Sequence, residues 1–122
     1  MLERRSAVGS PMVKCDLDPA NWITLETVFD TTPAIEHMFE VLGDRVGSDH
    51  AKDVEIENRL AIHIDNVPAG DGRLDFQAFI KGLEALGPET YLIIEGCPVE
   101  DTERVRGFLV EQATEAGVTI RE

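Results

Sequence analysis

One stretch organises this sequence: Val46-Gly-Ser-Asp-His-Ala-Lys-Asp-Val54. It begins and ends like a short buried β-strand, but it also carries two carboxylates, an imidazole and an ammonium. A buried charge is costly unless it is paired or bound to a metal. The charges therefore indicate a strand that ends at a rim where side chains face a shared site, with Asp49 expected to point outward.

Composition limits the classes of function. A chain of 122 residues with 43% hydrophobic residues fits one small domain with a real core. Its 11 Lys and Arg against 24 Asp and Glu give a net charge of -13, which argues against nucleic acid or an anionic membrane as partner because both require a basic surface. The acidic residues suit cations, or they simply form a solvated surface.

The cysteines and the N-terminus indicate a soluble, cytoplasmic protein. Cys15 and Cys97 lack the CxxC spacing of a zinc knuckle and do not suggest a disulfide framework, so reduced thiols are expected. The N-terminus lacks an apolar signal region, and no apolar run approaches the ~18 residues that span a bilayer.

Outward from the central stretch, strands and helices are predicted to alternate. The run Thr90 to Ile94 is continuously apolar, which is typical of a strand buried on both faces of a parallel sheet. Alternating βα units also imply a parallel sheet. Residues 2–8 read as the end of a helix. We expect strands at 12–17, 46–54 and 90–94, a hairpin with arms 53–57 and 59–64 turning at Asn58, and helices at 33–42, 76–86 and 102–116.

Three of the predicted strands end in metal-binding residue types, namely Asp18, His50 and Glu95. Parallel neighbours direct such residues to the same edge of a sheet, where functional groups collect. Two carboxylates and an imidazole suit Mn²⁺, Mg²⁺ or Co²⁺, with Zn²⁺ also acceptable. The alternative is three unrelated residues with ordinary hydrogen bonds, and no local spacing motif decides between the two interpretations.

Four motifs occur in a defined order: Asp18-Pro-Ala-Asn21, His50-Ala-Lys-Asp53, Gly70-Asp-Gly-Arg-Leu-Asp-Phe76 and Leu92-Ile-Ile-Glu95. Together they resemble the ordered signature of sugar phosphate isomerase/epimerase proteins with the xylose isomerase-like TIM barrel. The resemblance covers residues 10–116. It implies an α/β fold in which parallel βα units form the C-terminal part of a (β/α)8 TIM barrel.

The family holds a divalent metal with two glutamates, an aspartate and a histidine. By motif, Asp18, His50 and Glu95 take three of these places, and Glu95 is also the candidate catalytic residue for proton transfer. Asn21 stands where many relatives have a histidine beside the substrate. Lys52 and Asp53 would face the substrate or orient the ligands, or they would form an ion pair at the rim.

Length departs from the family pattern, because such a barrel needs ~250 residues and this chain has 122. Residues 1–122 are therefore expected to form a partial barrel of about the last three βα units. The N-terminal half, with the fourth ligand, would be absent. The chain is then either a fragment or a half-barrel that covers its open sheet edges by forming a homodimer or by pairing with a missing half.

The implied function is that of a divalent-metal-dependent sugar or sugar-phosphate isomerase or epimerase. The metal would polarise the carbonyl and hydroxyl oxygens, and a carboxylate would move the proton through an enediolate. A lyase of the same fold, such as an inosose dehydratase, is one alternative. A truncated inactive chain or a non-enzymatic sugar-binding fragment is another. An apurinic-site endonuclease fits poorly, since the chain has three histidines and a charge of -13.

Overall fold

The computed structural model describes residues 9–57 and 59–121. The expected helix end at residues 2–8 and the turn at Asn58 lie outside the described residues. Three 3-10 turns connect the longer elements: η1 (Pro19–Trp22), η2 (Gly43–Arg45) and η3 (Val99–Asp101). The strands are β1 (Cys15–Leu17), β2 (Val46–Glu57), β3 (His63–Pro68) and β4 (Leu92–Ile94), and the α-helices are α2 (Thr32–Leu42), α3 (Phe76–Leu86) and α4 (Thr102–Glu115).

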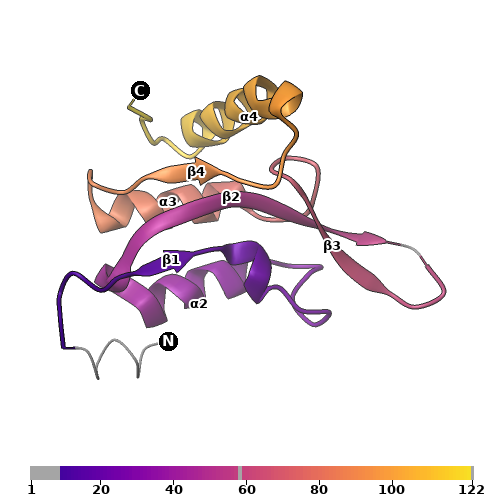
Figure 1. Cartoon of the computed structure of the whole chain (residues 1–122), viewed down its shortest axis with the longest axis horizontal. Helices are drawn as coiled ribbons and strands as arrows, with labels where there is room; N and C mark the ends of the chain where they lie inside the picture. The colour runs from indigo at the N-terminus through magenta and orange to yellow at the C-terminus, as the bar shows by residue number, and fades with distance from the viewer. Residues whose placement is uncertain (1–8, 58, 122) are drawn as a thin grey trace.

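Strand β2 is the centre of the sheet, because the other three strands all pair with it. Its first part runs parallel to β1 and to β4, with Leu17 opposite Asp49 and Ala51 opposite Ile94. Its second part runs antiparallel to β3, with Glu57 opposite His63. Figure 1 shows β2 as a long curved strand between β1 and β4 that continues into a projecting hairpin with β3.

The prediction of parallel βα units forming part of a TIM barrel is wrong, because the four strands form a mixed sheet. The connection between β2 and β3 comprises only residues 58–62, whereas a parallel return needs a crossover of about a dozen residues or more. Strand β3 therefore folds back antiparallel to β2. The antiparallel pairing agrees with the predicted hairpin arm at 53–57, and this arm is continuous with the strand predicted at 46–54, so that β2 runs from Val46 to Glu57.

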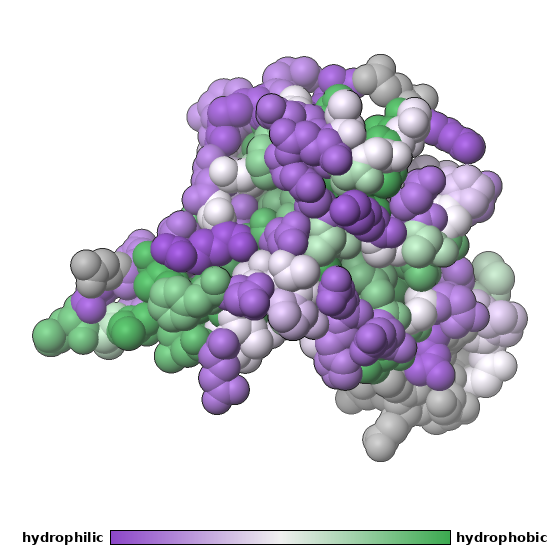
Figure 2. All heavy atoms as spheres, turned by 180° about the vertical axis from the view of Figure 1, so that it is seen from behind, coloured by the Kyte–Doolittle hydropathy of each residue, from purple (hydrophilic) through white to green (hydrophobic). Residues whose placement is uncertain are grey.

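The second arm of the hairpin lies later in the sequence than predicted. Residues 59–62 belong to the connection, and β3 begins only at His63. The alternation of apolar residues there resembles a strand, but both apolar side chains lie at the end of the hairpin. Leu60 is fully exposed and Ile62 is 63% exposed. Seen from behind, the projecting arm carries hydrophobic surface (Figure 2). Alternation alone therefore does not indicate burial here.

The helices lie close to their predicted positions and build the core on one face of the sheet. The carboxylate of Asp75 accepts a hydrogen bond from the Ala78 backbone N–H at 2.9 Å, which caps α3. Figure 1 shows α2 and α3 behind the sheet, and α4 beside β4 and α3. Fully buried residues from strands and helices form one core, including Leu17, Ile35, Met38, Ala51, Val54, Phe79 and Val105.

The opposite face of the sheet is polar and partly open. Ile93 is predicted to be buried within a strand covered on both faces, but its side chain is 46% exposed. Successive side chains of a strand point to opposite faces, so His50 and Lys52 share this face while Asp49 and Ala51 point toward the helices. Within the described ranges, no helix is long and apolar enough to cross a bilayer.

Candidate metal centre

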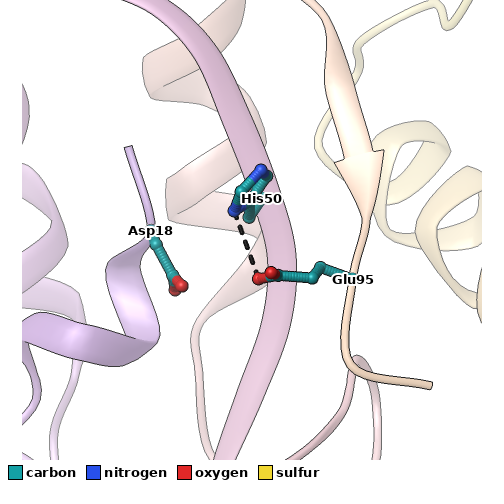
Figure 3. Close-up of side chains that lie close together, drawn as sticks. All are labelled: Asp18, His50 and Glu95. Carbon is teal, nitrogen blue, oxygen red and sulfur yellow. Dashed lines mark ion pairs between the residues drawn. The ribbon is translucent and has the colours of Figure 1, made fainter. Parts of the chain in front are cut away.

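Asp18, His50 and Glu95 lie together on the polar face of the sheet and form what we call the candidate metal site. One ligand atom from each residue lies within 4.8 Å of the other two. Figure 3 shows the carboxylates of Asp18 and Glu95 approaching His50 from the strands on either side of β2. Together these three side chains could hold a metal ion.

The parallel register explains this meeting. Leu17 pairs with Asp49 and Ile94 pairs with Ala51, so the residues that follow β1 and β4 flank the middle of β2. The prediction that His50 also ends a strand is wrong, because β2 continues to Glu57. The two short strands end beside His50, while β2 runs on to pair with β3.

His50 has a carboxylate at each ring nitrogen. Nδ1 lies 3.2 Å from Oε2 of Glu95, and Nε2 lies 3.2 Å from Oδ2 of Asp16. A neutral imidazole has only one N–H, so it donates to only one of these oxygens. The lone pair on the other nitrogen then faces a negative oxygen. That contact is favourable only when a proton or a cation lies between the two atoms.

Lys52, a predicted substrate-binding residue, lies beside the ligands. Its Nζ is 2.6 Å from Oδ2 of Asp18 and 3.1 Å from Oε2 of Glu95, and the side chain is only 13% exposed. The hydrogen bond to Asp18, supported by Glu95, outweighs burial and raises the pKa of Lys52 above its ordinary value. Lys52 is therefore a firmly protonated cation at neutral pH.

Asp18 offers one oxygen that other groups leave free. Its side chain is 11% exposed, and Oδ2 accepts from Lys52 and, at 2.9 Å, from Nδ2 of Asn21. Oδ1 is buried and has no hydrogen-bond partner among residues 9–57 and 59–121. An unpaired buried oxygen is unfavourable, and a metal ion would satisfy it. Asn21 is predicted to contact substrate, and the structure places its amide against this ligand.

Sequence reasoning missed Asp16. Its carboxylate accepts a hydrogen bond from Ser48 Oγ at 2.6 Å and faces His50. The group around His50 thus contains three carboxylates, those of Asp16, Asp18 and Glu95, and one lysine cation, Lys52, which contacts Asp18 and Glu95. The excess of two negative charges matches one divalent cation. The available signal was strand alternation, since Asp16 precedes Asp18 by two residues and so points to the same face.

Asp53 lies elsewhere, although the sequence motif groups it with Lys52 as a substrate-facing residue. Its side chain is 1% exposed and accepts hydrogen bonds from the backbone N–H groups of Val54, Gly70, Gly72 and Leu74 at 2.8 to 3.1 Å. Burial raises the pKa of Asp53, and the four N–H groups oppose that rise. A Cβ on Gly72 would come within 2.2 Å of the Val54 carbonyl oxygen. Asp53 holds the loop before α3.

Asp49 does not point outward as predicted. It is 0% exposed, because alternation along β2 directs it toward the helices. Neither carboxylate oxygen has a hydrogen-bond partner in the described part of the chain. Burial, with a smaller contribution from the negative charge of Asp16, raises the pKa of Asp49 to about 7.

Comparison with known proteins does not assign this chain to a family. No family model matches the chain, and no curated protein matches it either. The resemblance to sugar phosphate isomerases and epimerases stays a prediction. Function is therefore inferred from the geometry of the candidate metal site.

Proposed function

We propose that this chain carries a divalent-metal site for the isomerisation or epimerisation of a sugar or sugar phosphate. One observation carries the proposal: ligand atoms of Asp18, His50 and Glu95 lie within 4.8 Å of one another. Two carboxylates and one imidazole suit Mn²⁺, Mg²⁺ or Co²⁺, and Zn²⁺ is also compatible. The carboxylates of Asp16, Asp18 and Glu95 exceed the ammonium of Lys52 by two formal negative charges, which favours a divalent over a monovalent ion.

A bound metal would supply Lewis-acid polarisation of the substrate's carbonyl and hydroxyl oxygens. The side chain of Glu95 is 45% exposed, the most accessible of the three ligands. Its carboxylate takes the proton from the carbon next to the carbonyl and returns it after the electrons have rearranged. Lys52, held protonated beside Asp18 and Glu95, donates a hydrogen bond to the oxygen on which negative charge develops.

Calorimetric titration with Mn²⁺ and Co²⁺ tests the metal site directly. We expect Asp18→Ala and Glu95→Ala to weaken binding by at least about tenfold, because each loses a direct ligand. Asp44→Ala and Glu89→Ala are matched controls, since both residues are exposed and lie outside the group of ligands. If all four variants bind like the wild-type chain, the site does not exist as described.

Hydrogen exchange tests the reaction across many sugars at once, so the substrate need not be identified beforehand. The chain with Mn²⁺ is incubated in deuterated water with a panel of aldoses, ketoses and their phosphates, and proton NMR follows the carbon next to the carbonyl. We expect deuterium to enter at that carbon, and Glu95→Gln to abolish this exchange. Loss of water from the substrate would indicate a lyase instead. Metal binding without either reaction would leave a non-enzymatic binding protein.

A further inference from the structure

We propose that Asp16 is a positioning residue that fixes the tautomer of His50, so that Nδ1 is the nitrogen that presents its lone pair to the metal. The inference rests on the proposed metal site. Asp16 is not one of the three residues that form the ligand group, so it acts through His50. Ser48, Asp16 and His50 form a chain of contacts that leads from the surface of the sheet to the site.

The backbone places this chain of contacts. Asp16 of β1 pairs with Ser48 of β2 in the parallel register, so their side chains lie next to each other on the polar face. His50, two residues further along β2, points to the same face. Ser48 Oγ donates to Oδ1 of Asp16 at 2.6 Å, which leaves Oδ2 for His50 Nε2 at 3.2 Å.

The two carboxylates that face His50 are not equivalent acceptors. Oε2 of Glu95 also contacts the ammonium of Lys52 at 3.1 Å, and that positive charge weakens its attraction for a second N–H. Oδ2 of Asp16 has no such cation within its ion-pair contacts among the described residues. The single N–H of a neutral His50 therefore goes to Asp16.

This choice leaves the nitrogen that lies near the ligand carboxylates unprotonated. Nδ1 is 3.2 Å from Oε2 of Glu95, so its lone pair points where a metal would bind. Metal-binding histidines usually donate their second N–H to a carboxylate or carbonyl, which fixes the ring and increases its basicity. The opposite tautomer would place a proton on Nδ1 and block that nitrogen.

Long-range proton–nitrogen NMR of the metal-free chain reads directly which ring nitrogen of His50 carries the proton. We expect the wild-type His50 to carry its proton on Nε2, and Asp16→Ala to move the population toward Nδ1. Asp16→Asn retains an acceptor oxygen and should restore much of the Nε2 form. His37 and His63, both exposed and outside the site, serve as references in the same spectra and should not change.

Titration with Co²⁺ provides the second measurement. Loss of a supporting carboxylate lowers metal affinity by about tenfold or more, so Asp16→Ala should bind Co²⁺ at least about tenfold more weakly, and Asp44→Ala should not. An Nδ1–H tautomer in the wild-type chain, or the same tautomer in wild type and Asp16→Ala, overturns the proposal. If Asp16→Ala does not fold, the spectra of wild type and Asp16→Asn still show which nitrogen of His50 carries the proton. An Nε2–H tautomer that needs Asp16, without metal binding, would reject only the proposed function.

Discussion

The ammonium nitrogen of Lys52 lies 2.6 Å from Oδ2 of Asp18, so a fixed cation shares a carboxylate with the candidate metal site. A divalent ion held by Asp18 would be repelled by this ammonium. At about 4 Å in water the repulsion is on the order of 2 kcal/mol for a double charge. We therefore expect Lys52→Met to raise the affinity for Mn²⁺ or Co²⁺ by about tenfold or more, measured by calorimetric titration.

Two further variants separate the charge of Lys52 from its other properties. Lys52→Arg keeps the positive charge and should leave metal affinity within a few-fold of wild type. Lys81→Met removes the same charge from an exposed position on α3 and controls for the change in net charge. Weaker metal binding by Lys52→Met would contradict the expectation and would show that the ammonium mainly holds the carboxylates in place.

The buried carboxylate of Asp49 predicts a pH-dependent stability. Its pKa is about 7 in the folded chain against an ordinary 3.8, so the folded state retains a proton that the unfolded state loses. Stability therefore falls as pH rises from about 4 to about 7, at up to about 1.4 kcal/mol per pH unit. Asp49→Asn cannot ionise, and we expect it to be more stable than wild type at pH 8 by up to several kcal/mol.

Urea unfolding of both proteins between pH 4 and pH 8, with EDTA present, measures this effect. The difference between the wild-type and Asp49→Asn stabilities isolates Asp49 from the other carboxylates. That difference should grow in favour of the variant as pH rises. A difference that stays constant across the range would mean that Asp49 does not titrate there.

Asp53 should be important for folding and not for metal binding. Its carboxylate is the acceptor for four backbone N–H groups at the loop before α3. Asp53→Ala leaves these donors without their partner, and such losses cost about 1–3 kcal/mol for each buried group that water does not reach. We expect a loss of about 3 kcal/mol or more in the free energy of unfolding. Asp44→Ala, at an exposed site, should change stability by less than about 0.5 kcal/mol.

More of the candidate metal site than of the fold could be predicted from the sequence. Asp18 and Glu95 follow short strands that flank β2 in parallel register, and the pattern of strands followed by charged residues is visible in the sequence. Strand alternation would also have separated His50 and Lys52 from Asp49 and Asp53. The sequence offered no expectation that Asp49 is buried, since a carboxylate without partners is rarely placed in a core.

Local patterns predicted the mixed sheet only in part. The hairpin between β2 and β3 was visible in the sequence, but the parallel pairing of β2 with β1 and β4 joins segments far apart in the chain, and the pattern did not show that one strand takes part in both. Leu60 and Ile62 have the alternation of a strand, yet both are exposed at the hairpin end. The antiparallel hairpin was predicted, but its second arm begins four residues later than expected, at His63 and not at Arg59, which changes which side chains belong to the sheet.

Metal binding should also stabilise the fold, because the three ligands come from separate strand segments that meet only in the folded chain. Asp18 follows β1, His50 lies in β2 and Glu95 follows β4. A ligand that binds only the folded state adds about 2.7 kcal/mol at a concentration of 100 times its dissociation constant. We expect Co²⁺ at that concentration to shift the urea midpoint upward accordingly.

The net charge of -13 requires a control, because any cation screens repulsion between surface carboxylates. Sodium chloride at matched ionic strength measures this general effect and should give a smaller shift than Co²⁺. Asp18→Ala should lose the additional stabilisation by Co²⁺, while Glu89→Ala, at an exposed position, should retain it. An equal Co²⁺ shift in Asp18→Ala and wild type would mean that the ion acts through the surface and not through the candidate metal site.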